Sequence, residues 1–259
     1  MKRFVLPLLL LSLAGPVAAG EPLPPDPLED RSMVRAGFLS NHPDWEYRLI
    51  GYEAYRQGRH DDAFAAFRRA GFFADKLSQA MIAEMYWSGT GVQRDRALAY
   101  AWMDLAAERG YASFLRLRER YWRRLDAAER QRALDEGQAI YAQFGDAVAK
   151  PRQERLLRMA LRSVVGSRTG FGGNGQTLVI AQSGGIDSTV DNTKFYDRQY
   201  WEPKQYWQYQ DLVQRDIRTG YGSAGELEQH AASDATNALI ATDGDSVDEP
   251  APPVEERPR

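Results

Sequence analysis

Residues 80–110 have the pattern of two amphipathic helices joined by a glycine turn. Ile82 and Met85 are three residues apart and share one face of a first helix, and alanines recur with Trp102 at helical spacing in a second. Gly89-Thr90-Gly91 lies between them, and glycine adopts a positive φ without a side-chain clash. One such hairpin cannot bury its apolar face alone, so the segment predicts a fold in which several hairpins stack.

Within this segment the motif Tyr-x-x-Gly-x-Gly-Val is followed by Asp, by Ala-x-x-Trp and by Ala-Ala-x-x-x-Gly. This series resembles the Sel1-like repeat, a relative of the tetratricopeptide repeat. The resemblance implies a solenoid of helix pairs that binds a partner and is not an enzyme. The positions that define the repeat are Tyr86, Gly89, Gly91, Asp95, Ala99, Trp102, Ala106, Ala107 and Gly110.

A weaker copy of the pattern precedes the first. Tyr55 lies 31 residues before Tyr86, and Phe67 lies 35 residues before Trp102, close to the length of a helix-pair repeat. Gly58 marks the turn of this copy, which lacks the Gly-x-Gly-Val insertion and is closer to an ordinary tetratricopeptide unit.

Further helices follow the two copies. We expect a short helix at 111–120, a second that opens with a capping box at Asp126 and Glu129, and a third from Pro151 after a break at Lys150-Pro151. The sequence therefore predicts a mostly α protein, a Sel1/TPR-like helix-pair solenoid with a small irregular C-terminal segment of short strands plus one helix.

The two ends of the chain differ from its middle. Lys2-Arg3, an apolar run and the small residues ending at Ala19 are typical of a secretory signal, although a retained membrane anchor is the alternative. The run is short for a transmembrane helix. The predicted regions are a signal peptide at 1–19, a Pro-rich linker at 20–40, a helical repeat domain at 41–165, an aromatic-rich segment at 166–224 and a disordered acidic tail at 225–259.

The signal sequence predicts a periplasmic or secreted protein. The chain contains no cysteine, which excludes both disulfides and acylation at a lipobox cysteine. After removal of Lys2 and Arg3 the formal net charge changes from −3 to −5, which argues against nucleic acid as a partner. Once the signal is cleaved, no integral membrane segment is expected.

The segment 166–224 allows two interpretations. Residues 177–181 read as a short strand, and Pro203 is placed to begin a helix that runs to about Ile217. The aromatic cluster on both sides of Pro203 would form a plug on the last repeat, or it would stack on sugar rings as in carbohydrate-binding modules. The rings concerned are Trp201, Tyr206 and Trp207.

Two other patterns suggest ligands. Ser183–Ser188 (SGGIDS) resembles the phosphate-binding loop of the ATP-pyrophosphatase family, but a turn between two short strands explains the same residues. The many arginines from Arg116 to Arg168 predict a solvated helix face with i, i+4 partners or, alternatively, a face for an anionic ligand.

The sequence offers little that suggests catalysis. His42, His60 and His230 are scattered, so no metal site is expected, and neither a cysteine nucleophile nor a Gly-x-Ser-x-Gly elbow is present. No cofactor is expected.

We therefore expect a non-catalytic exported scaffold that mediates protein–protein or protein–peptide interaction in the cell envelope. A cell-wall carbohydrate-binding module is one alternative. A β-lactam- or peptidoglycan-directed enzyme is another, although the Sel1-like proteins associated with β-lactams carry disulfides that this chain lacks. The candidate partner-binding residues on the inner helices are Glu53, Arg56, Glu84 and Trp87.

Overall fold

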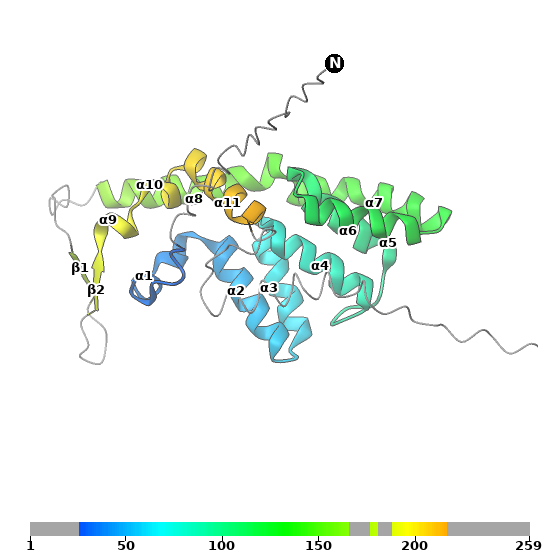
Figure 1. Ribbon diagram of the computed structural model, residues 1–259, viewed down its shortest axis with the longest axis horizontal. Helices are drawn as coiled ribbons and strands as arrows, with labels where there is room; N and C mark the ends of the chain where they lie inside the picture. The colour runs from blue at the N-terminus through cyan, green and yellow to red at the C-terminus, as the bar shows by residue number, and fades with distance from the viewer. Residues whose placement is uncertain (1–25, 166–176, 181–187, 217–259) are drawn as a thin grey trace, which may run out of the picture.

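The computed structural model describes residues 26–165, 177–180 and 188–216. Most of these residues are helical, which confirms the prediction of a mostly α protein. The elements, drawn in Figure 1, are α1 (Arg31–Arg35), η1 (Phe38–Asn41), α2 (Pro43–Arg56), α3 (His60–Phe72), α4 (Lys76–Ser88), α5 (Arg96–Ala106), η2 (Ala107–Arg109), α6 (Ala112–Arg124), α7 (Ala127–Phe144), α8 (Asp146–Val165), β1 (Thr177–Ile180), β2 (Ser188–Asp191), α9 (Asn192–Phe195), α10 (Arg198–Trp201) and α11 (Pro203–Asp216).

The helices α2–α5 form two hairpins that lie side by side. α2 packs on α3, α4 packs on α5, and α3 contacts α4, so the second hairpin lies against the first. The rings of Tyr52 and Phe67 meet edge to face with centroids 5.2 Å apart in their shared core. A Cβ added to Gly51 would lie 2.5 Å from the Phe67 ring, so α2 and α3 approach more closely than a larger residue would allow.

The glycine turn after α4 docks the second hairpin on the first. Gly89 and Gly91 have φ values of +80° and +71°. A Cβ on Gly91 would lie 2.6 Å from the His60 Cβ and 2.9 Å from the His60 carbonyl oxygen at the start of α3. Asp95 then caps α5 by accepting a hydrogen bond of 3.0 Å from the Leu98 N–H.

The other repeat-defining residues also have packing roles. Tyr86 meets the Phe64 ring edge to face at 5.3 Å. Trp102 is only 3% exposed, and its ring lies 4.7 Å from that of Phe144 at the end of α7. Gly110, with φ +74°, ends η2. The remaining members are buried small residues: Ala99, Ala106 and Ala107.

A third pair of helices covers α5. Both α6 and α7 pack on it. The predicted capping box at the start of α7 is confirmed: the Asp126 carboxylate accepts from the Glu129 N–H at 2.8 Å, and the Glu129 carboxylate accepts from the Asp126 N–H at 2.9 Å.

The helix expected from Pro151 begins five residues earlier, at Asp146. The predicted break at Lys150-Pro151 is wrong because the boundary between the two helices lies at Gly145, whose backbone is extended (φ −64°, ψ 154°). The Gly145 N–H bonds the Tyr141 carbonyl at the end of α7, and its carbonyl accepts from the Ala149 N–H at the start of α8. In Figure 1, α7 and α8 follow one another along the long axis of the molecule.

Residues 26–40 are folded, so the predicted linker at 20–40 is wrong over this part; residues 20–25 lie outside the described chain. The Asp30 carboxylate caps α1, accepting from the Ser32 N–H at 2.9 Å. The apolar side chains that follow enter a second core formed with the aromatic residues of α9–α11, and Met33 and Phe38 are buried there.

The aromatic segment acts as a plug, but at a different place from the one predicted. Trp201 lies 5.6 Å from Phe38 and 4.7 Å from His42, ring centroid to ring centroid. α10 and α11 pack on α8, and their rings meet η1 and the start of α2. The plug therefore covers the beginning of the helical array, not its last repeat.

The C-terminal segment contains a strand pair before its helices. β1 pairs with β2 in antiparallel register, with Ile180 opposite Ser188. Residues 181–187, which include most of SGGIDS, lie outside the described chain. As predicted, α11 begins at Pro203, and it ends at Asp216.

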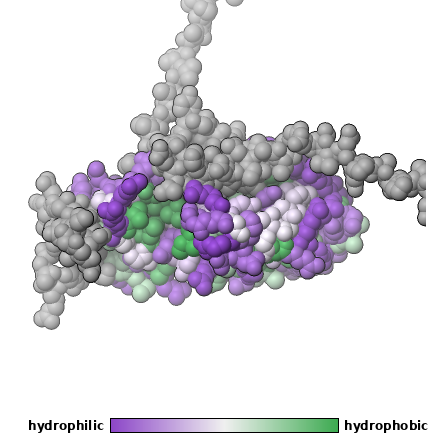
Figure 2. Space-filling view, turned by 90° about the horizontal axis from the view of Figure 1, so that it is seen from below, coloured by the Kyte–Doolittle hydropathy of each residue, from purple (hydrophilic) through white to green (hydrophobic). Residues whose placement is uncertain are grey.

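Several predictions concern regions outside the described residues, namely the signal peptide at 1–19 and the acidic tail at 225–259. Within the described chain, no helix combines the length and the apolar character needed to cross a bilayer. The face shown in Figure 2 is largely hydrophilic, with a limited hydrophobic area.

Replacement of Gly91 by alanine tests the docking of the two hairpins. We expect Gly91→Ala to lower the free energy of unfolding by about 2–4 kcal/mol, since a left-handed alanine costs ~1–2 kcal/mol and overpacking adds ~1–3 kcal/mol. Urea unfolding followed by circular dichroism measures this loss.

Gly58→Ala is the matched control. Gly58 has a similar φ of +74°, but a Cβ there would meet nothing within 4 Å. This variant should show only the left-handed strain of ~1–2 kcal/mol. Equal losses in the two variants would contradict close packing of the turn on α3.

Candidate functional site

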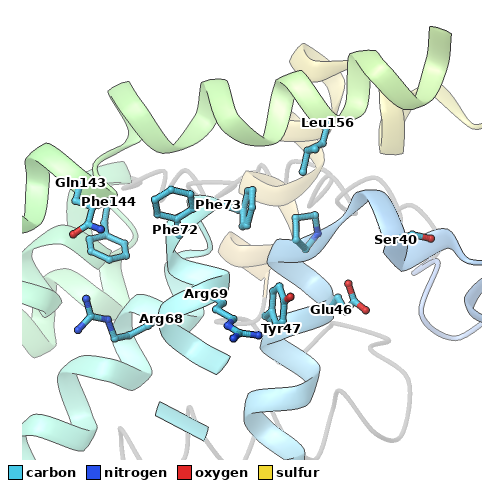
Figure 3. A pocket seen from close by; sticks show the side chains of 11 residues that line it. Ser40, Glu46, Tyr47, Arg68, Arg69, Phe72, Phe73, Gln143, Phe144 and Leu156 are labelled. Atoms are coloured by element: carbon cyan, nitrogen blue, oxygen red, sulfur yellow. The ribbon is translucent and has the colours of Figure 1, made fainter. Parts of the chain in front are cut away.

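A pocket of about 510 Å³ opens between α2, α3 and the junction of α7 with α8. Cavities of this size commonly hold a small ligand or part of a peptide. Figure 3 shows Phe72 and Phe73 beneath α8, with Arg68 extending toward Phe144 and Arg69 toward Tyr47. The residues that line the pocket are Ser40, Pro43, Glu46, Tyr47, Arg68, Arg69, Phe72, Phe73, Gln143, Phe144 and Leu156.

The apolar part of the pocket is a set of phenylalanine rings. Phe72 meets Phe73 and Phe144 edge to face, with centroid distances of 5.5 and 6.2 Å. The Arg152 guanidinium from α8 lies 3.7 Å from the centroid of the Phe72 ring. Arg152 also donates to the carbonyls of Phe72 at 3.1 Å and Gln143 at 2.7 Å, which joins α8 to the ends of α3 and α7.

The buried side-chain amide of Gln79 connects the ends of α3 and α7 beneath the pocket. The Gln79 side chain is fully buried and donates to the Gly71 carbonyl at 3.0 Å and the Phe144 carbonyl at 3.1 Å. Its own carbonyl accepts from the Lys76 ammonium at 3.1 Å. The ends of α3 and α7 are thus tied together by contacts inside the protein, so the pocket is preformed.

Two arginines at the pocket lie over aromatic rings. The Arg68 guanidinium is 5.6 Å from the Phe144 centroid, and Arg69 is 5.3 Å from that of Tyr47. Both residues are exposed. In the described part of the chain, neither has a carboxylate within the 4.0 Å of an ion pair. Glu46 is the acidic residue among the described lining.

This arrangement is suited to binding. Arginine pairs with carboxylates and phosphates in a bidentate fashion, and a ring beneath the guanidinium limits its motion. Among the described lining residues there is no histidine or cysteine, and the Ser40 hydroxyl donates to the Gly37 carbonyl. The pocket therefore fits a ligand that combines an apolar group with an anionic one.

The four predicted partner-binding residues lie outside this pocket, and two of them are covered by α6. The Glu84 carboxylate accepts from the Tyr121 hydroxyl at 2.5 Å, and burial raises the pKa of Glu84. Trp87 stacks on the Tyr121 ring with centroids 4.1 Å apart. The prediction of Glu84 and Trp87 as partner-binding residues is corrected, because Tyr121 of α6 packs against both side chains. Glu53 and Arg56 are exposed and pair with each other at 3.2 Å.

The predicted sugar-stacking surface is also wrong. Trp201, Tyr206 and Trp207 are 2%, 0% and 9% exposed, which leaves no ring face for a sugar. The Trp201 Nε1–H donates to the Phe195 carbonyl, and the Arg109 guanidinium lies 4.9 Å from the Trp207 ring centroid. These rings are part of the second core.

A cluster of buried charges lies where α2, α4, η2 and α8 meet. Asp146 accepts from Arg109 at 2.7 Å and pairs with Lys76 at 3.0 Å, and Arg48 pairs with Asp75 at 2.9 Å. Burial raises the pKa of Asp146, but the hydrogen bond and charge of Arg109 outweigh burial and hold that pKa well below its ordinary value. The cavity here is about 10 Å³, room for roughly one water molecule, so we assign the cluster a structural role.

Asp44 is fully buried beside this cluster. Burial raises its pKa to about 7, and the nearby Asp75 acts in the same direction. A hydrogen bond from the Tyr206 hydroxyl and the charge of Arg48 oppose this rise and do not cancel it.

Comparisons with family models, curated proteins and solved structures gave no match to this chain. In the residues that the structure covers, no group of three or more histidines, cysteines or acids is placed to hold a metal ion. The pocket is accordingly interpreted from its own geometry.

Sequence reasoning missed this pocket, although a signal was present. Arg68-Arg69 and Phe72-Phe73 are two doublets four residues apart at the end of α3. Adjacent residues of a helix point in different directions, so two neighbouring phenylalanines cannot both face one core. One of them had to meet another element, and that element, α8, comes more than seventy residues later.

Asp44 should make stability depend on pH. Its carboxyl ionises near pH 4 in the unfolded chain and near 7 in the folded one, so folding favours the protonated form. The contribution of Asp44 to the unfolding free energy should fall by a few kcal/mol between about pH 4 and pH 7, at ~1.4 kcal/mol per pKa unit. The buried His42, whose pKa burial lowers to about 4, acts in the opposite direction over the same range. Asp44→Asn should remove the Asp44 contribution, so that the unfolding free energy rises more steeply with pH than in the wild type in urea titrations at a series of pH values.

The control is Asp61→Asn, which removes one exposed carboxylate from the first turn of α3. It should leave the slope between pH 4 and pH 7 in place. Asp146 acts in the opposite direction. Because its pKa is lowered in the folded protein, it reduces the free energy of unfolding only when the pH falls below the ordinary pKa of an aspartate. An Asp44→Asn protein with the wild-type slope would refute the assignment.

Proposed function

We propose that this protein is an exported, non-catalytic scaffold of Sel1-like helix hairpins that binds a peptide segment of an envelope partner in the pocket between α3 and α8. Support for the repeat part comes from the stacking of α2–α5 through Gly91 and from the burial of Trp102. Support for export comes from the charged, apolar and small-residue regions of residues 1–19.

One observation carries the binding proposal. Arg68 and Arg69 present exposed guanidinium groups over aromatic rings, with no carboxylate of the described chain in ion-pair distance, at the edge of a pocket with a phenylalanine floor. Other arginines of the described chain pair with acids, such as Arg109 with Asp146 and Arg132 with Asp95. An acidic group supplied by a partner would form ion pairs with Arg68 and Arg69 at the pocket.

The pocket suits a short anchor and not a broad interface. One aromatic or aliphatic side chain would contact Phe72 and Phe73, and an acidic side chain or terminal carboxylate close by would meet the arginines. Binding energy in such interfaces is concentrated in a few anchors. The proposed ligand class is therefore a peptide with an apolar residue next to an anionic group.

Peptide display against the folded protein, followed by fluorescence anisotropy with the selected peptides, tests this function. We expect the selected sequences to combine an apolar residue with an acid. Arg68→Gln with Arg69→Gln should weaken their binding by about tenfold or more, because a hydrogen bond to a charged group contributes ~1.5–3 kcal/mol.

Arg56→Gln with Arg59→Gln is the matched control, since these exposed arginines belong to the same hairpin and lie outside the pocket. This control should retain binding. Loss of binding in the control alone would move the site to the end of α2, where Glu53 and Arg56 were first predicted to bind. Failure to select any peptide would count against a peptide-binding function.

A further inference from the structure

The helix α6 carries a second group of arginines, and its surroundings differ from those of the pocket. Its thirteen residues include five arginines and one glutamate. Arg116, Arg120 and Arg123 are spaced four and three residues apart and share one face. They line a surface hollow of about 480 Å³ together with Leu115, Glu119 and Arg124.

The positive charge of Arg116, Arg123 and Arg124 is not neutralised by an ion pair within the described chain. Arg118 pairs with Asp104 at 3.3 Å and with Glu119 at 2.7 Å. By contrast, no described carboxylate lies in ion-pair distance of Arg116, Arg123 or Arg124. Like charges three and four residues apart destabilise a helix, so an anionic group over this face would stabilise the protein.

The charge distribution of the whole chain points to the source of that group. Residues 225–259 contain nine acidic residues and two arginines, a formal charge of −7. The complete chain carries −3, so residues 1–224 carry +4. The helix α6 alone has a formal charge of +4. Without Lys2 and Arg3 of the proposed signal peptide, residues 20–224 carry +2, so α6 supplies more positive charge than this whole stretch retains, and the acidic excess lies in one segment.

The position of α11 brings that segment within reach. The Tyr111 hydroxyl donates to Asp211, and Arg109 lies 3.8 Å from the same carboxylate. Tyr111 is the residue that precedes α6, so α11 passes the beginning of that helix. Glu226 lies ten positions after Asp216, the end of α11, and an extended chain of that length spans up to ~35 Å. A helix of thirteen residues is only about 20 Å long.

We propose that the acidic segment 225–259 binds, within the same molecule, to the arginine face of α6 formed by Arg116, Arg120 and Arg123. The contact is electrostatic and involves no fixed register, because the acids are spread along the segment. Salt therefore weakens it, and an anionic partner competes for it.

Energy transfer between two labels in the full chain tests the proposal. Because the chain has no cysteine, Ala128→Cys near the end of α6 and Ser246→Cys in the acidic segment give two defined labelling sites. We expect high transfer at ~20 mM salt and about twofold lower transfer at ~500 mM salt, where screening is strong. Arg116→Gln with Arg120→Gln and Arg123→Gln should lower transfer at low salt to the same degree.

Two comparisons separate this contact from a general charge effect. Arg31→Gln with Arg94→Gln and Arg155→Gln removes three exposed arginines elsewhere and should leave transfer unchanged. Neutralising Asp243, Asp245, Asp248 and Glu249 to the corresponding amides should lower transfer without altering any described helix, so the test holds even if the α6 variant folds poorly.

Three outcomes would overturn the proposal. One is transfer that responds neither to salt nor to the α6 arginines. Another is transfer between two singly labelled molecules at the same efficiency, which would place the segment on a second copy. In the last outcome, transfer does not change when the α6 arginines are replaced, but binding of the protein to phosphatidylglycerol vesicles is lost. That result would assign the face to an anionic lipid.

Discussion

The buried pairing of Asp146 with Arg109 and Lys76 aligns the two cores of this protein. Arg109 also donates to the Ala74 carbonyl in the turn between α3 and α4, and its guanidinium lies over Trp207 of α11. One carboxylate at the first turn of α8 thus holds the first hairpins, the second core and α8 in fixed positions. Breaking such a buried pair leaves an uncompensated charge, which typically costs ~3–5 kcal/mol.

The pocket is a consequence of that alignment. Its walls come from α2 and α3 on one side and from α7 and α8 on the other, so it exists only when α8 lies across the ends of the hairpins. Arg152 and Gln79 then fix the floor by donating to carbonyls at the ends of α3 and α7. A site built from such contacts is rigid before the ligand arrives, and little ordering entropy opposes binding.

The two arginine groups illustrate different uses of the same residue. Arg68 and Arg69 lie over rings beside an apolar floor, which favours a ligand of defined shape. The arginines of α6 line a hollow whose described lining includes no aromatic residue, which favours a polyanion without defined shape. Both surfaces are positively charged, so charge alone does not distinguish them. The aromatic rings beside Arg68 and Arg69 make that surface the more selective of the two.

Local chemistry made part of this structure predictable. The turn at Gly89 and Gly91, the Asp126 capping box and the start of α11 at Pro203 all depend on residues within four positions of each other. For that reason the helical class and the pairing of α4 with α5 followed from the sequence by itself.

Contacts between distant residues decided the rest. Phe38 meets Trp201 across 163 positions, which folded a segment predicted to be a linker and buried rings predicted to meet sugar. Tyr121 covers Trp87, and Arg152 covers Phe72, so a position that looks solvent-facing on one helix becomes part of a contact or a pocket. Helical periodicity gives the direction of a side chain on its own helix, and only the tertiary structure determines which element lies in that direction.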